Sequence, residues 1–378
     1  MEFKGICVSD GKPRRIIVEN GVYKSVEEIS YSGDSFLSVG FTDMQVNGYL
    51  GIDYSGPDLT IEGIRQVVVA LMKTGTLHHV ATIITNSEER IIRNLRIMAE
   101  AVRKDRLIRD SLVGIHIEGP FIAMKDGPRG AHDPKYVRKP DIEEARRWQA
   151  AAEGLIKIIT VAPEQDNAPE FTRQAVKMGI NVAIGHCEPT DEQINRIVEA
   201  GAALSTHLGN GSSAMLPRLK NHIWTQLADD RLMAGIISDG FHLPYSVLKA
   251  FRRTKGLDKL ILVSDVIPHA GLKPGPSKWG DINVEICEDG HIALAGTQLL
   301  AGAGHLLDWD LRVFCEATGT PLEDAIRTVT VNPMKAIGNK EDFSFIPGNK
   351  ADIIEFRKGD KRLEITGFAL GSEEGTGR

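Results

Sequence analysis

Short apolar segments alternate with longer amphipathic segments through the middle of the chain, and this alternation restricts the fold more than any other feature. One amphipathic segment, TDEQINRIVEAG, has a helix start signal at Thr190 and a glycine stop at Gly201. Repeated strand–helix units predict an α/β fold, a (β/α)8 TIM-type barrel, over residues 41–335. The apolar segments are HHVATIITN, SLVGIHIEG, IKIITVAPE, INVAIGHC, AALSTHLGN, LMAGIISDG and KLILVSDV.

The two ends of the chain have a different pattern, made of β-branched runs and turn residues. Near the start, RRIIVENGVYKSV places an Asn-Gly turn between two such runs, which is typical of a β-hairpin. Near the end, GNKADIIEF and RLEITGFAL indicate two further strands separated by a charged turn. Because strands this short cannot bury a face alone, we expect residues 1–40 and 336–378 to form one small β-sandwich domain.

Polar side chains stand at the ends of the predicted barrel strands. Glu118 ends the strand in GIHIEGPF, His186 and His207 follow two later strands, and Asp265 follows the last one. Barrel enzymes place their active sites where the carboxyl ends of the strands converge. One carboxylate and two imidazoles are typical ligands of a catalytic Zn²⁺ or similar ion that keeps a position open for water. Asp265 would act as a general base or acid beside that water.

The charge and cysteine content exclude several classes of protein. A net charge of −6 and a pI near 6.0, without a basic run, argue against nucleic acid or a membrane surface as a partner. The four cysteines are scattered without a CxxC pair, which favours reduced thiols in a cytoplasmic protein. No apolar run approaches the length of a membrane span, and the first residues lack the apolar core of a signal peptide.

Many short motifs, taken in order, resemble those of the N-acetylglucosamine-6-phosphate deacetylases of the amidohydrolase superfamily. The resemblance runs over almost the whole chain and implies a metal-dependent barrel enzyme that removes the N-acetyl group of an amino sugar, giving acetate and a free amine. The motifs that carry it are GFTDMQVNGYLGID, GIHIEGPF, KDGPRGAHDPKYVRKPD, TVAPE, IGHCEPT, THLGN, SDGFHL, LVSDVIPHAG, LAGT and VNPMKAIG.

The resemblance also implies a role for individual residues. A protonated His132 would stabilise the oxyanion, and Asp265 would be the acid/base that moves the proton between water and the leaving amine. The implied metal ligands are Glu118, His186 and His207, and the implied substrate contacts are His132, Asn210, Gly211 and His242.

The first barrel strand departs from the pattern of many amidohydrolases, which place His-x-His there and hold two metals. This chain has Gln45 and Asn47 at these positions, and amides are poor ligands for a transition metal compared with imidazole. We therefore expect one divalent metal ion, most simply Zn, with Fe, Co or Mn as alternatives.

A second departure lies where these deacetylases carry an arginine segment for the 6-phosphate. The corresponding stretch here is HLGNGSSAMLPRLKNHIWTQL, in which Arg218 could take that role with help from Lys220 or His222. The alternative is that Arg218 and Lys220 belong to a solvated loop. The leading substrate is thus N-acetylglucosamine-6-phosphate, with an unphosphorylated or different N-acyl amino sugar as the alternative.

Two further rivals remain at this point. One is an amidohydrolase acting on a cyclic amide or an acylated amino acid, against which the motifs GAH and SDGFHL argue. The other is a metal-binding homologue that has lost catalysis, against which an intact Asp265 beside intact ligands argues. The resemblance implies that the enzyme is a homodimer.

Overall fold

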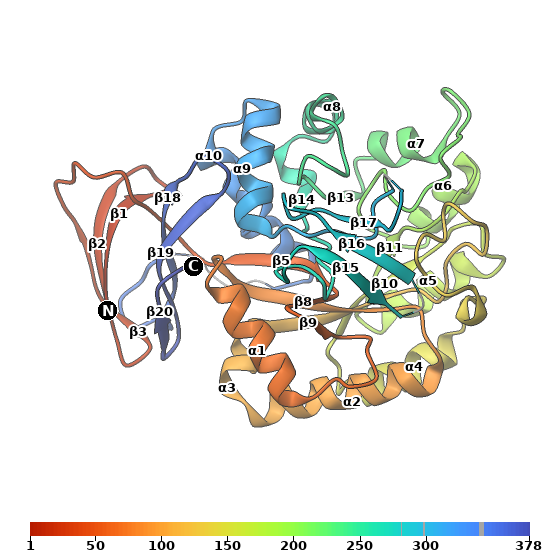
Figure 1. Cartoon of the computed structure of the whole chain (residues 1–378), viewed down its shortest axis with the longest axis horizontal. Helices are drawn as coiled ribbons and strands as arrows, with labels where there is room; N and C mark the ends of the chain where they lie inside the picture. Colours follow the sequence, from red (N-terminus) through yellow and green to blue (C-terminus); the bar gives the residue numbers. More distant parts are fainter. Residues whose placement is uncertain (281, 298, 340–343) are drawn as a thin grey trace.

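The chain folds into a barrel with a separate β-sheet beside it (Figure 1). The computed structural model describes residues 1–280, 282–297, 299–339 and 344–378. In Figure 1 the terminal sheet lies on the left, and the barrel with its surrounding helices lies on the right.

The barrel sheet contains eight parallel strands, as the alternation predicts. Neighbouring strands pair in chain order, and a bridge between Val46 and Val266 brings the first strand next to the segment that follows the last. The predicted TIM-type barrel is therefore confirmed. Its strands are β5 (Phe41–Val46), β8 (Thr76–Ile84), β9 (Leu112–Glu118), β10 (Ile156–Val161), β11 (Asn181–Ile184), β12 (Leu204–Ser205), β13 (Met233–Ile236) and β14 (Leu260–Leu262).

Helices between the strands cover the outside of the barrel (Figure 1). The first of them buries Ile64, Val67, Val68 and Leu71, which share one helix face by their spacing. Within the described ranges, no helix is both long enough and apolar enough to cross a membrane. The helices are α1 (Ile61–Met72), α2 (Glu88–Lys104), α3 (Arg106–Ser111), α4 (Ile142–Ala151), α5 (Ala168–Lys177), α6 (Asp191–Glu199), α7 (His222–Ala228), α8 (Tyr245–Lys255), α9 (Leu307–Thr318), α10 (Leu322–Ala325) and α11 (Val331–Ala336).

The terminal sheet takes its strands from both ends of the chain. The predicted Asn-Gly turn joins β2 to β3, with positive φ of 53° at Asn20 and 78° at Gly21. The sheet curves back on itself, because the Tyr23 amide donates to the carbonyl of Asn349, which precedes another strand of the same sheet. The strands, in sheet order, are β20 (Glu373–Gly375), β19 (Leu363–Leu370), β18 (Asp352–Lys358), β4 (Phe36–Ser38), β1 (Glu2–Cys7), β2 (Pro13–Glu19) and β3 (Val22–Glu28).

This curvature gives the terminal sheet its own enclosed core, as a sandwich requires. Phe3, Ile16, Leu37 and Ile353 form part of one buried cluster there. We propose that residues 1–40 and 336–378 form one domain and residues 41–335 the other, as the sequence predicts.

A three-stranded antiparallel sheet follows β14 and was not predicted from the sequence. It consists of β15 (Gly275–Trp279), β16 (Ile282–Ile286) and β17 (Ile292–Leu294). It lies over the barrel strands in the view of Figure 1, and its Trp279 lines the cavity described below. A two-stranded sheet, β6 (Gly48–Tyr49) with β7 (Ile52–Asp53), follows the first barrel strand.

Candidate active site

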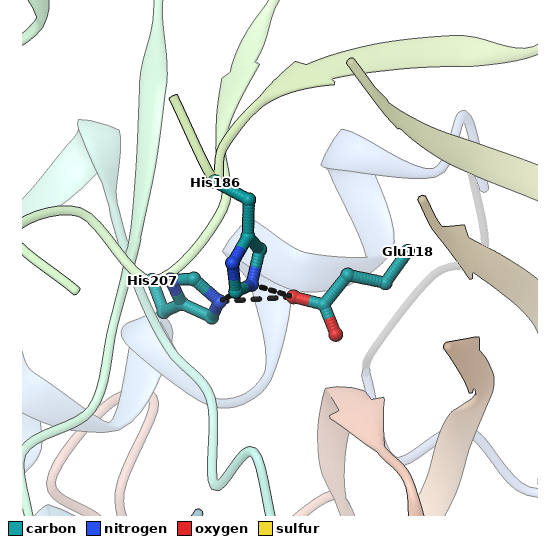
Figure 2. A group of neighbouring side chains, drawn as sticks. All are labelled: Glu118, His186 and His207. Atoms are coloured by element: carbon teal, nitrogen blue, oxygen red, sulfur yellow. Dashed lines mark hydrogen bonds and ion pairs between the residues drawn. The ribbon is translucent and has the colours of Figure 1, made fainter. Parts of the chain in front are cut away.

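Three side chains from three barrel strands meet at the carboxyl ends of those strands (Figure 2). Glu118 is the last residue of β9, while His186 and His207 follow β11 and β12 by two residues. The His186 Nε2 atom lies 3.1 Å from Glu118 Oε1, and the His207 Nε2 atom lies 2.9 Å from the same oxygen. The two Nε2 atoms are 3.0 Å apart. The structure thus brings together the three residues that the sequence predicts as metal ligands.

The backbone at this site occupies a region that most residues avoid. His186, His207 and Asp265 have positive φ values of 49°, 26° and 53°. Such left-handed conformations are uncommon outside glycine, and they concentrate at functional sites because the surrounding fold must hold them. At each of these residues the backbone bends away just past the end of the strand. The bend points the side chain toward the mouth of the barrel.

The hydrogen bonds of His186 indicate that the cluster fits a cation. Its Nδ1 lies 2.9 Å from the carbonyl oxygen of Pro128, and a carbonyl can only accept, so Nδ1 carries the proton. In a neutral His186, Nε2 therefore presents a lone pair to Glu118 Oε1, which is also an acceptor. A divalent ion between these atoms removes that conflict, and an O,N,N donor set is one that such ions prefer.

The charges around the cluster support the same conclusion. Burial alone would raise the pKa of Glu118, but its hydrogen bonds with His186 and His207 hold that pKa well below its usual range. Burial alone would lower the pKa of His207, but Glu118 outweighs this effect and raises it to about 9. The Glu118 carboxylate therefore stays ionised and favours positive charge on the imidazoles beside it, and a bound cation would take the place of that proton.

Gln45 and Asn47 donate hydrogen bonds to the two carboxylates of the site. Gln45 Nε2 lies 2.8 Å from Glu118 Oε1, and Asn47 Nδ2 lies 2.8 Å from Asp265 Oδ1. The sequence predicts only that these amides are poor metal ligands, and it did not reveal their role as donors. Partners of this kind orient a ligand and its neighbours, and they affect a metal site nearly as strongly as the ligands themselves.

Asp265 is half-buried beside the cluster, and its pKa is shifted. Burial and the negative charge of Glu118 raise its pKa to about 6, while His207 and the hydrogen bond from Asn47 oppose the rise. A carboxyl group whose pKa lies this close to neutrality can both accept and return a proton, as a general acid/base must.

A cavity of about 420 Å³ opens above these groups. Among the described residues that line it, there is no lysine or arginine. Arg218 is exposed and is not among the lining residues, so the structure does not bring it to the other predicted contacts. The predicted site residues that do line the cavity are Glu118, His132, His186, His207, Asn210, Gly211, His242 and Asp265.

His132 lies against the cluster and is held by Thr85. Its Nδ1 is 2.8 Å from Thr85 Oγ1, and its Nε2 is 3.3 Å from His186 Nε2. Burial and the neighbouring His186 lower the pKa of His132 well below its usual range, and a bound cation would lower it further. This lowering of the pKa argues against the expectation of a protonated His132 and favours a neutral ring.

Gly119 makes room for the Thr85 contact. Its φ is +82°, and a Cβ at this position would lie 2.2 Å from Thr85 Oγ1. Only glycine satisfies both conditions, which explains in part why the strand that ends in Glu118 is followed at once by glycine.

His242 is fixed by Asp239, which follows β13. One Asp239 oxygen lies 2.7 Å from His242 Nδ1, and the other accepts hydrogen bonds from the backbone amides of Phe241 and His242 at 2.9 Å each. Asp239 therefore determines how the His242 ring faces the cavity.

Comparisons with known proteins agree with this geometry. The amidohydrolase family matches residues 36–371, which is most of the chain. The chain belongs to the amidohydrolase family. This family is metal-dependent, and the cluster of Glu118, His186 and His207 fits a metal ion.

Two relatives with the same name are similar over most of the chain. The N-acetylglucosamine-6-phosphate deacetylase of Bacillus subtilis (strain 168) is 31% identical over 92% of this chain and 87% of its own length. The enzyme of that name from Bos taurus is 31% identical over 85% of this chain and 80% of its own length. The resemblance recognised in the sequence motifs is thereby confirmed.

A solved structure is similar over nearly the same range. It is a variant of N-acetyl-D-glucosamine-6-phosphate deacetylase from Mycobacterium smegmatis in complex with N-acetyl-D-glucosamine-6-phosphate. Its TM-score is 0.84 at 26% identity, and the match covers 96% of this chain and 94% of that chain.

Proposed function

We propose that this amidohydrolase removes the N-acetyl group of N-acetylglucosamine-6-phosphate and yields glucosamine-6-phosphate and acetate. The observation that carries the proposal is the pairing of the Glu118, His186 and His207 cluster with Asp265 in one cavity. The comparisons support the substrate, because relatives at 31% identity carry that activity in their names.

One divalent ion is proposed for this cluster, with Zn²⁺ first and Fe, Co or Mn as alternatives. Its ligands would be Glu118 Oε1, His186 Nε2 and His207 Nε2. Such an ion lowers the pKa of a bound water to near neutrality and polarises a carbonyl group. Gln45 would hold the Glu118 carboxylate in place through the hydrogen bond to Oε1.

Asp265 would move the proton during hydrolysis. As the ionised carboxylate it accepts a proton from the attacking water, and it then returns this proton to the amine nitrogen as the C–N bond breaks. The second step is essential because an amide nitrogen leaves poorly without a proton. A pKa of about 6 supports this double role near neutral pH.

The remaining cavity residues would bind and orient the sugar. A neutral His132 can donate from Nε2 to the developing oxyanion if Thr85 donates to its Nδ1. His242, held by Asp239, would contact a sugar hydroxyl or the phosphate. Asn210 and Gly211 would contact the sugar or its substituents.

A lysine or arginine that binds the 6-phosphate would have to reach it from beyond the described cavity lining, which includes neither residue type. Arg218 is proposed for this contact, since it lies on the exposed stretch that leads from Asn210 toward α7. The test of this assignment is given in the Discussion.

An acetate-release assay decides among the candidate functions. The metal-loaded protein should release acetate from N-acetylglucosamine-6-phosphate and much less from N-acetylated amino acids. Cyclic amides release no acetate when their ring opens, so they are followed by loss of substrate, and little loss is expected. No hydrolysis of any of these substrates by the loaded protein would identify a catalytically silent homologue and would refute the proposal.

A homodimer in the cytoplasm is also proposed. The dimer rests on the family resemblance, and light scattering from the purified protein tests it. The location is supported by the four cysteines, all of which have free thiols in the structure, as a reducing compartment favours.

A further inference from the structure

A second group of metal-binding side chains lies in the turn between β16 and β17, outside the active site. Cys287, Asp289 and His291 each offer a donor atom, and these atoms all lie within 4.8 Å of one another. They belong to a sequence of only five residues, CEDGH. None of them lines the active cavity.

The hairpin itself brings these side chains together. The Cys287 amide donates to the His291 carbonyl at 2.9 Å, and the Gly290 amide donates to the Cys287 carbonyl at 2.9 Å. Gly290 adopts a φ of +90°, which lets the chain reverse. Cys287 and His291 therefore stand opposite each other across the hairpin, and opposed residues of an antiparallel pair project from the same face.

Asp289 completes the group from the tip of the turn. Its Oδ1 lies 2.5 Å from His291 Nδ1, so its carboxylate faces back toward the hairpin rather than outward. Folding has thus already placed a thiol, a carboxylate and an imidazole on one side of a short turn, and little further ordering would be needed to bind an ion.

The donor set determines which ions would bind. A thiolate and an imidazole favour Zn²⁺ and Co²⁺, whereas Ca²⁺ and Mg²⁺ prefer oxygen ligands only. Asp289 is exposed, and Cys287 and His291 are half-buried, so an ion can reach them from solvent. Three protein ligands leave a fourth position for water. We propose that this turn is a second, thiolate-containing site for a divalent transition-metal ion.

The site lies behind one wall of the active cavity. The His291 ring stacks on Phe241 at a centroid distance of 4.8 Å, and Phe241 lines the active cavity next to His242. The proposed ion would therefore bind behind Phe241, outside the active cavity. It would be separate from the ion proposed for Glu118, His186 and His207.

Cobalt gives a direct test, because a thiolate bound to Co²⁺ produces a strong charge-transfer absorption in the near ultraviolet. The ligands Glu118, His186 and His207 include no sulfur, so this band cannot come from the active-site cluster itself. Titration of the metal-free full chain with Co²⁺ should produce the band in the wild type and in Cys315→Ser, a matched control in α9. The band should be absent in Cys287→Ser.

A second variant extends the test to another ligand. His291→Gln should weaken the Co²⁺ affinity read from the band by roughly tenfold or more, since even loss of a group that only supports a ligand costs that much. Absence of the band in the wild type, or its persistence in Cys287→Ser, would overturn the proposal. The readout needs no turnover, so the outcome is independent of whether the chain deacetylates an amino sugar.

Discussion

The Asn47 side-chain amide donates a 2.8 Å hydrogen bond to Oδ1 of Asp265, across the line where the barrel closes. The two residues are 218 positions apart in the chain. They meet because the bridge between Val46 and Val266 brings β5 beside the segment that follows β14. Closure of the barrel therefore orients the proposed acid/base.

Replacing Asn47 tests this relationship. In Asn47→Ala, the Asp265 carboxylate loses the donor that fixes its orientation, and we expect kcat to fall roughly 10- to 100-fold, the range seen for such supporting groups. Metal content should remain as in the wild type, because Asn47 bonds to none of the three proposed ligands. Asn181→Ala, at the start of β11 and away from the cavity, is the matched control. Equal kcat values for the two variants would contradict the role given to Asn47.

Asp265→Asn removes the acid/base and keeps the shape of the side chain. We expect kcat to fall at least about 10²- to 10⁴-fold, the usual contribution of such a group, while metal content is retained. Steady-state acetate release and metal analysis on the same preparation provide the measurement. An active Asp265→Asn enzyme would refute the proposed mechanism.

Metal removal is expected from each single ligand change. Glu118→Ala, His186→Ala and His207→Ala each leave two ligands, too few for a catalytic site of this type. Elemental analysis should find about one ion per chain in a Cys287→Ser background, which removes the turn from the count, and close to none in the three variants. Two tightly bound ions in that background would contradict the expectation drawn from Gln45 and Asn47.

The sequence predicts the barrel and the meeting of Glu118, His186 and His207, for a local reason. Buried parallel strands are apolar along most of their length, and in a barrel their carboxyl ends carry the active-site residues. Apolar runs that end in Glu118, His186 and His207 therefore indicate both the barrel and the position of the candidate site. The Asn-Gly hairpin of the terminal sheet is likewise coded in adjacent residues.

The features that sequence reasoning missed depend on residues that are distant in the chain or on burial. Whether Asn47 acts as a ligand or a donor depends on Asp265, which reaches it only when the barrel closes. The charge of His132 depends on its burial against His186, which no local pattern shows. The sheet of β15–β17 lacks the apolar runs of the barrel strands, since its side chains are largely exposed or half-buried.

His79 should make the fold sensitive to acid. It is fully buried against Tyr54, with its Nε2 2.8 Å from the Tyr54 hydroxyl, and burial lowers its pKa from 6.5 to about 3. As the pH falls below 6.5, His79 becomes protonated in the unfolded chain but stays neutral in the folded chain. Stability is therefore complete above that pH and is lost progressively down to about pH 3. By pH 5 the loss is about 2 kcal/mol.

A difference between two proteins isolates this effect from other titrating groups. Urea unfolding of the wild type and of His79→Asn should be measured at pH 7 and pH 5. The wild type should lose about 2 kcal/mol more than the variant over this interval. Equal losses in both proteins would show that His79 does not carry the acid sensitivity.

The substrate phosphate provides the last prediction, because the active cavity itself supplies no cation among its described lining residues. If Arg218 binds the phosphate, Arg218→Ala should lower kcat/KM for N-acetylglucosamine-6-phosphate by roughly tenfold or more and leave that for N-acetylglucosamine unchanged. The size follows from the 1.5–3 kcal/mol typical of a hydrogen bond to a charged group. Arg231→Ala is the matched control, since its guanidinium is exposed and already paired with Asp229.

Arg90 offers a second arm for the same experiment. It lines, with Arg129, a cavity of about 510 Å³ that shares His132 and Trp279 with the active cavity. A selective loss on the phosphorylated sugar in Arg90→Gln, and not in Arg218→Ala, would move the phosphate into that adjoining cavity. A wild type that prefers the neutral sugar, with neither variant changing the preference, would overturn the phosphate assignment. The deacetylase proposal would survive that result, because it rests on Glu118, His186, His207 and Asp265, which do not depend on charge at the sugar's far end.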